Sequence, residues 1–71
     1  MTAPEVDITV NGEPRRVPAG LTIAGLLALL GVPDGRVGVE RNRQLVRRGD
    51  FAATRIEAGD RIEIVSFVGG G

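Results

Sequence analysis

Hydrophobic and polar residues alternate strictly over residues 6–10, which predicts a strand with one buried face. Asn11 and Gly12 follow at once, and both tolerate positive φ, so a two-residue turn is expected there. The chain then returns over residues 15–17, and Pro14 indicates that this second strand either lies at a sheet edge or starts late. The residues predicted to face inward from the first strand are Val6, Ile8 and Val10.

A helical spacing replaces this alternation over residues 22–30. Thr22 is the expected N-cap, and Gly31 suits the left-handed residue that ends a helix. Gly25 inside the helix costs about 1 kcal/mol relative to Ala. It indicates either a close approach to a neighbouring backbone or simple tolerance of glycine. The apolar stripe that repeats at i, i+3, i+4 and i+7 is Ile23, Leu26, Leu27 and Leu30.

Shorter strands are expected in the second half, over residues 37–40 and 45–46, with a turn at Asn42 and Phe51 filling the core. Alternation resumes over residues 61–67 and predicts the last strand. If Ile62 and Ile64 point inward, Ser66 does so as well, and Val65 and Phe67 face outward as a docking patch. The alternative is that Phe67 turns into the core. The resulting order of strands and one helix predicts an α+β fold.

The size and composition allow one folded domain and argue against several functions. The chain has 71 residues, 42% of them hydrophobic, and its nine basic and nine acidic residues cancel. No net field therefore attracts nucleic acid or an anionic membrane, and the apolar run 21–32 is shorter than the about 20 residues that a membrane-spanning helix needs. Cys, His, Lys, Tyr and Trp are absent. This absence removes thiolate and imidazole chemistry, so we expect no metal site and no autonomous enzyme.

Three glycines end the chain, and they divide it into a domain over residues 1–68 and a tail, Gly69–Gly71. Glycine has no side chain, so the tail is expected to be flexible and narrow enough to enter a partner's active site. Its terminal carboxylate is ionised at neutral pH and is a poor electrophile until it is activated. The sequence lacks a P-loop lysine and a GxGxxG motif. Activation is therefore assigned to a partner enzyme.

Two segments, "VDITVNGEPRRVPAGLTIAGLLALLGV" and "RIEAGDRIEIVSFVGGG", resemble the ThiS family of sulfur carrier proteins over essentially the whole chain. The resemblance implies a β-grasp, ubiquitin-like fold, in which four to five strands pack on one main helix and the last strand runs parallel to the first. One departure is Arg43, which stands where a glycine often follows the asparagine of the turn. We therefore expect a looser turn at Asn42.

The resemblance also implies a function in thiamine biosynthesis. An E1-like adenylyltransferase would use ATP to adenylate Gly71, and a cysteine desulfurase or rhodanese-like donor would supply the sulfur of a thiocarboxylate. A thiazole synthase would then accept that sulfur. Gly69 and Gly70 would enter the partner's active site with Gly71. The carrier would bind no cofactor itself and would work in the cytoplasm, as a monomer when free, without nucleic acid or membrane.

Other interpretations of the sequence stay open. The chain could be the small subunit of a molybdopterin synthase, another thiocarboxylate carrier, or a non-catalytic β-grasp interaction module with an inert end. The partner-binding residues are expected to be Val65, Phe67 and Val68. Charged residues that either contact a partner or are merely solvated are Arg41, Arg43, Arg47 and Arg48, and Glu57, Asp60 and Glu63.

Overall fold

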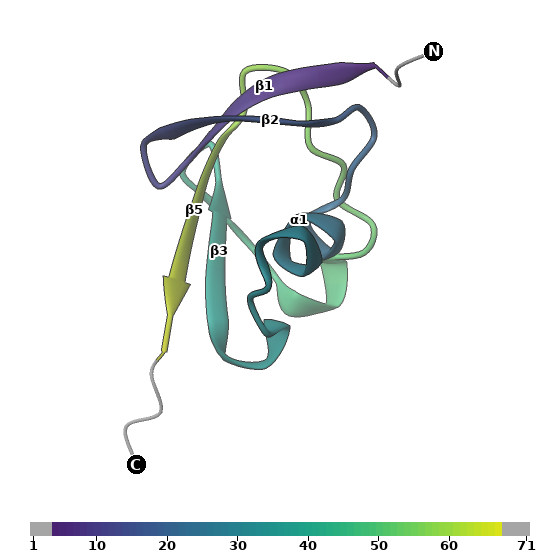
Figure 1. Ribbon diagram of the computed structural model, residues 1–71. Helices are drawn as coiled ribbons and strands as arrows, with labels where there is room; N and C mark the ends of the chain where they lie inside the picture. Colours follow the sequence, from purple (N-terminus) through teal and green to yellow (C-terminus); the bar gives the residue numbers. More distant parts are fainter. Residues whose placement is uncertain (1–3, 68–71) are drawn as a thin grey trace.

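A helix packed on one face of a mixed sheet makes up the computed structural model, which describes residues 4–67 (Figure 1). The sheet has five strands in the order β2-β1-β5-β3-β4. β5 lies at its centre, parallel to β1 and antiparallel to β3. The expected α+β class and the parallel pairing of first and last strands are confirmed. The strands are β1 (Glu5–Val10), β2 (Glu13–Pro18), β3 (Val37–Arg41), β4 (Gln44–Val46) and β5 (Arg61–Ser66), and the helices are α1 (Ile23–Leu30) and the 3-10 turns η1 (Asp34–Arg36) and η2 (Arg48–Asp50).

The first hairpin forms as its sequence predicts. Val10 pairs with Glu13, and the two turn residues, Asn11 and Gly12, have φ of 51° and 84°. Positive φ at both positions matches the right-handed twist of the flanking strands. Pro14 lies in β2, which is an edge strand, so its missing amide hydrogen leaves no bond of the sheet interior unmade.

Helix α1 begins and ends at the predicted residues. The Thr22 hydroxyl accepts a hydrogen bond from the Gly25 amide at 3.1 Å, and Gly31 adopts φ 71° after the last turn. A β-carbon at Gly25 would lie 2.6 Å from Cδ1 of Leu21. The close neighbour is thus a side chain, and the expected backbone approach is wrong. Within residues 4–67 no helix has the length and apolar character needed to cross a membrane.

The core fills the space between α1 and the inner face of the sheet. The predicted helical stripe is buried there, although Leu30 is only half-buried. Phe51 is 3% exposed, so it is the core aromatic that the sequence predicts. Full burial of each such side chain contributes about 1.5 to 3 kcal/mol. The buried apolar residues are Ile8, Val10, Val17, Ile23, Leu26, Leu27, Val37, Val39, Phe51, Ile56 and Ile62.

The turn between β3 and β4 is tighter than expected. Arg41 pairs with Gln44, so the turn has two residues, Asn42 and Arg43, with φ of 53° and 69°. Arg43 therefore occupies the left-handed region without glycine's freedom, at a cost of about 1 kcal/mol. The Asn42 side chain compensates, because it donates to Asp60 at 3.0 Å and accepts from the Arg61 amide at 2.9 Å.

Asp60 is a buried carboxylate that fixes the start of β5. It is 5% exposed and accepts hydrogen bonds from Nε of Arg41 at 2.6 Å and from the Glu57 amide at 2.8 Å. Burial by itself raises the pKa of Asp60, but these bonds and the one from Asn42 outweigh burial and hold the pKa below its ordinary value. Asp60 is thus held inside the fold, and its bond to the partly buried Arg41 means that neither is merely a solvated charge.

Replacing Asp60 by asparagine should lower the free energy of unfolding by about 2 kcal/mol at neutral pH, because a charge-assisted bond to Arg41 is lost. The pKa of Asp60 is lower in the folded state than in the unfolded state, where it is 3.8. The charged carboxylate therefore contributes its full stabilisation above pH 3.8, and this contribution is lost as the pH falls through the folded pKa. Urea unfolding should therefore give a difference in free energy of unfolding between the wild type and Asp60→Asn that is smaller at about pH 3 than at neutral pH.

The matched control is Glu13→Gln, because Glu13 is exposed on the edge strand β2. Its stability should follow the wild type at both pH values. An undiminished gap between wild type and Asp60→Asn in acid would contradict the role assigned to the Asp60 charge.

Candidate functional site

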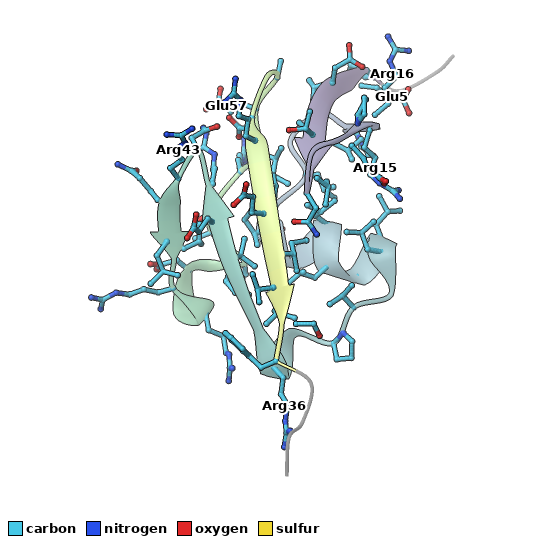
Figure 2. All side chains as sticks on the ribbon, turned by 90° about the vertical axis from the view of Figure 1, so that its left-hand side faces the viewer. Glu5, Arg15, Arg16, Arg36, Arg43 and Glu57 are labelled. Carbon is cyan, nitrogen blue, oxygen red and sulfur yellow. The ribbon has the colours of Figure 1, made fainter. Side chains whose placement is uncertain are left out.

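The end of β5 is the part of the sheet from which the predicted tail continues. Val65 pairs with Gly38, Ser66 pairs with Val37, and the Phe67 amide donates to the Arg36 carbonyl at 2.8 Å. In Figure 2, Arg36 marks this end of the sheet, far from the labelled Arg15 and Arg16. The predicted sites Val68, Gly69, Gly70 and Gly71 lie outside the described residues.

A side chain continues the pairing of β5 on the side where β1 stops. The last strand-paired residue of β1 is Val10, opposite Ile62, and the Asn11 amide then donates to the Ile62 carbonyl at 2.9 Å. The Asn11 side chain accepts from the Ile64 amide at 2.8 Å and donates to the Ile64 carbonyl at 3.2 Å. The Asn11 side chain therefore makes the two backbone hydrogen bonds of Ile64 that a longer β1 would have made. Its local pattern signals only a turn, so sequence reasoning missed this contact with a residue 53 positions away.

The outer face of β5 carries the predicted apolar pair. Val65 is 57% exposed and Phe67 is 59% exposed, so the outward parity is confirmed and the alternative core position of Phe67 is wrong. Ser66 lies on the opposite face but is exposed as well, because it is at the end of the strand. The ring of Phe67 lies over Gly38, where an added β-carbon would be 3.3 Å from Cζ. A side chain at position 38 would thus crowd the ring.

Gly38, Val65 and Phe67 line an open groove of about 210 Å³ on the face of the sheet away from α1. This volume is below the roughly 300 to 1,000 Å³ of small-molecule sites, so the groove suits a protein side chain better than a cofactor. Leu45 of β4, 71% exposed, forms its other wall. We call the exposed apolar residues, together with the glycine beneath the ring, the docking patch: Gly38, Leu45, Val65 and Phe67.

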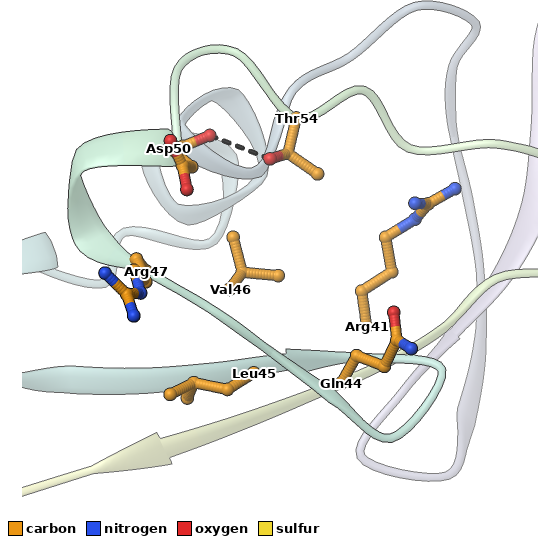
Figure 3. A pocket seen from close by; sticks show the side chains of 7 residues that line it. All are labelled: Arg41, Gln44, Leu45, Val46, Arg47, Asp50 and Thr54. Atoms are coloured by element: carbon orange, nitrogen blue, oxygen red, sulfur yellow. Dashed lines mark hydrogen bonds between the residues drawn. The ribbon is translucent and has the colours of Figure 1, made fainter.

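The predicted basic cluster does not form one surface. Arg41 is directed to Asp60 and lies 3.9 Å from Glu57, whereas Arg48 donates to the Gly35 carbonyl at 2.6 Å. Arg47 and Arg41 line a second cavity of about 190 Å³ beside β4 (Figure 3). In that view their guanidinium groups lie on opposite sides of Val46, so they do not converge on one anion.

No metal centre is found where the structure describes the chain. Among residues 4–67, no group of three or more acidic side chains lies close enough to hold an ion. The groups whose pKa departs clearly from its ordinary value are Asp60 and Arg41, and the pKa of Arg41 is raised mainly by its hydrogen bond to Asp60. Both belong to the network at the start of β5, which is the end remote from the tail.

Comparison with known proteins identifies a family and several proteins to which this chain is similar. The model of the ThiS family matches residues 8–71. The chain is 47% identical over 64 residues to a thiazole synthase of Magnetococcus marinus and 42% identical over 64 residues to one of Paramagnetospirillum magneticum, in each case over 90% of this chain and 20% of the relative. It thus spans about a fifth of the length of these curated relatives.

A solved structure agrees with the whole fold. The crystal structure of a thiamine biosynthesis protein, ThiS, from Geobacter metallireducens is 38% identical and superimposes with a TM-score of 0.80, over 93% of this chain and 100% of that one. The five-stranded sheet with one helix is therefore a β-grasp fold, as the sequence resemblance implies.

Replacing Asn11 by glycine tests the side-chain step of the ladder. Glycine adopts the positive φ of the turn freely, so the variant removes the two bonds to Ile64 and leaves the turn intact. We expect the free energy of unfolding to fall by about 1 kcal/mol and the Ile64 amide to exchange its hydrogen faster. Asn11→Asp keeps the acceptor and loses the donor, so its effect should be smaller. Unchanged exchange at Ile64 in Asn11→Gly would show that the side chain does not hold β5.

Proposed function

The chain belongs to the ThiS family, and from this we propose that it carries sulfur for the synthesis of the thiazole ring of thiamine. The observation that carries the proposal is that a segment similar to this chain forms a fifth of two proteins named thiazole synthase. A carrier and the enzyme that consumes its cargo gain from being held together, because tethering raises their effective concentration. A thiazole synthase is accordingly the proposed sulfur acceptor.

The proposed chemistry takes place at the carboxyl group of Gly71. An oxygen of this carboxylate attacks the α-phosphorus of ATP on an E1-like enzyme, and pyrophosphate leaves. The terminal sulfur of a persulfide on a cysteine desulfurase or rhodanese-like donor then attacks the acyl carbon and displaces AMP, which gives an acyl disulfide. A second thiol of the partner proteins attacks the donor's sulfur in that disulfide, so the partners are left with a disulfide bond and the carrier with a thiocarboxylate. The chain supplies the reacting group and the partners supply catalysis. ATP is therefore used by the partner and not bound by this chain. We propose the cytoplasm as the compartment in which these steps take place.

The composition and the fold support this division of labour. The whole sequence contains no Cys, His or Lys, so it lacks the usual side chains for nucleophilic and acid-base catalysis near neutral pH. β5 is bonded on both sides as far as Ile64, and directly after β5 the Phe67 amide donates to the carbonyl of Arg36, the residue before β3, two residues before Gly69. A rigid strand of this kind would deliver Gly69, Gly70 and Gly71 into a partner's active site while the domain stays folded.

The docking patch is the proposed contact surface for these partners, together with Val68 next to it in the sequence. Apolar residues exposed beside a reacting terminus provide binding energy without taking part in the chemistry. Aromatic side chains contribute most of the affinity in such contacts, so Phe67 is the expected centre.

The carrier function is tested by incubating the protein with the E1-like enzyme, ATP and a sulfur source and recording its intact mass. The mass should rise by the difference between one sulfur and one oxygen atom. A variant with one alanine added after Gly71 should gain nothing, because the end group no longer fits the partner's active site. An unchanged mass of the wild type would refute the proposal, and transfer to a molybdopterin synthase large subunit in place of a thiazole synthase would assign a different pathway.

Replacing Phe67 by alanine should weaken binding to the E1-like enzyme about 10- to 100-fold, measured by calorimetric titration. The free energy of unfolding should change by less than about 1 kcal/mol, because the ring is 59% exposed. The matched control is Leu29→Ala, an equally exposed apolar side chain on α1 at 56%. Loss of the fold in Phe67→Ala, or equal weakening by Leu29→Ala, would contradict the role of the docking patch.

A further inference from the structure

Two acidic side chains face each other across the outer face of the sheet. Glu40 of β3 and Glu63 of β5 are direct partners in the antiparallel register, and both are exposed. Like charges at directly opposite positions destabilise a sheet. The fold is thus less stable with this pair than with a neutral one.

No arginine of the described part of the chain neutralises these carboxylates. The ion pairs found among residues 4–67 are made by Arg16 and Arg41, and each binds other acidic residues. Arg41 follows Glu40 directly, so it points to the opposite face of β3. Arg61 shares the face of Glu63 but makes no ion pair with it within the described residues. The negative charge is therefore presented to solvent.

The acidic pair lies inside the docking patch. Leu45 is opposite Glu40 on β4, and Val65 follows Glu63 on the same face of β5. Both carboxylates line the same groove as Phe67. A partner that covers the apolar residues must therefore also cover both charges, which would be costly unless it brings a cation.

We propose that Glu40 and Glu63 together determine which partner binds, by selecting a surface of the E1-like adenylating enzyme that carries an arginine or lysine between apolar side chains. This inference rests on the proposed carrier function. A cation placed between the two carboxylates is attracted by both and removes their mutual repulsion, and exclusion of water by the apolar residues strengthens the attraction. Enzymes with a neutral or acidic surface at this point are rejected, because docking would leave both charges buried and unpaired.

The test compares the wild type with Glu40→Gln, Glu63→Gln and the double variant, using ATP-dependent pyrophosphate release by the E1-like enzyme at a series of carrier concentrations. We expect the double variant to raise KM about tenfold and leave kcat unchanged, because Gly71 and its chemistry are untouched. Added salt should raise the KM of the wild type more than that of the double variant. In the same proteins the Tm should rise, since the cross-strand repulsion is gone.

If the double variant has a higher KM and also a higher Tm than the wild type, misfolding cannot be the cause of its weaker binding. Glu13→Gln removes the same charge from the edge strand β2 and should leave KM unchanged. If the wild type reacts and the double variant keeps the same KM, the acidic pair is not a determinant, although the carrier function stands. If the wild type releases no pyrophosphate, the carrier function is wrong and the inference falls with it.

Discussion

The position of β5 between β1 and β3 is the constraint on which the rest of the structure depends. The strand that precedes the tail is also the central strand of the sheet, so the pair β2–β1 and the pair β3–β4 are joined into one sheet only through β5. Two polar side chains hold β5 in this position. Asp60 binds the turns that precede β5, and Asn11 extends its pairing beyond the end of β1.

Local patterns were sufficient for the elements whose residues are close in sequence. The alternation of residues 6–10, the Asn11–Gly12 turn and the caps of α1 each depend on a few neighbouring residues, and all form as predicted. The outward parity of Val65 and Phe67 followed from the same rule of alternation. The fold itself needed the resemblance, because periodicity does not say that the last strand pairs with the first.

The side-chain contacts of Asn11 and Asp60 with residues distant in sequence were missed or misjudged. Asp60 has the appearance of an ordinary turn residue, and its burial arises only when Arg41 and Asn42 approach from β3 and the turn after it. The same network explains why Arg43 adopts a positive φ that its own preference opposes. The docking patch and the acidic pair beside it differ in kind, since an exposed aromatic ring and two carboxylates that repel each other add nothing to folding. Their presence is understandable if part of the stability is given up for recognition.

The direction of β5 has a mechanical consequence. Tension applied to the end of this strand acts along its axis, across the hydrogen bonds that join it to its neighbours, which are perpendicular to the strands in the antiparallel pair with β3 and slanted in the parallel pair with β1. All the hydrogen bonds that join β5 to its neighbours bear such a load together, so they do not break one after another. A domain built this way resists unfolding when another protein pulls on the end of β5, even though its core is small.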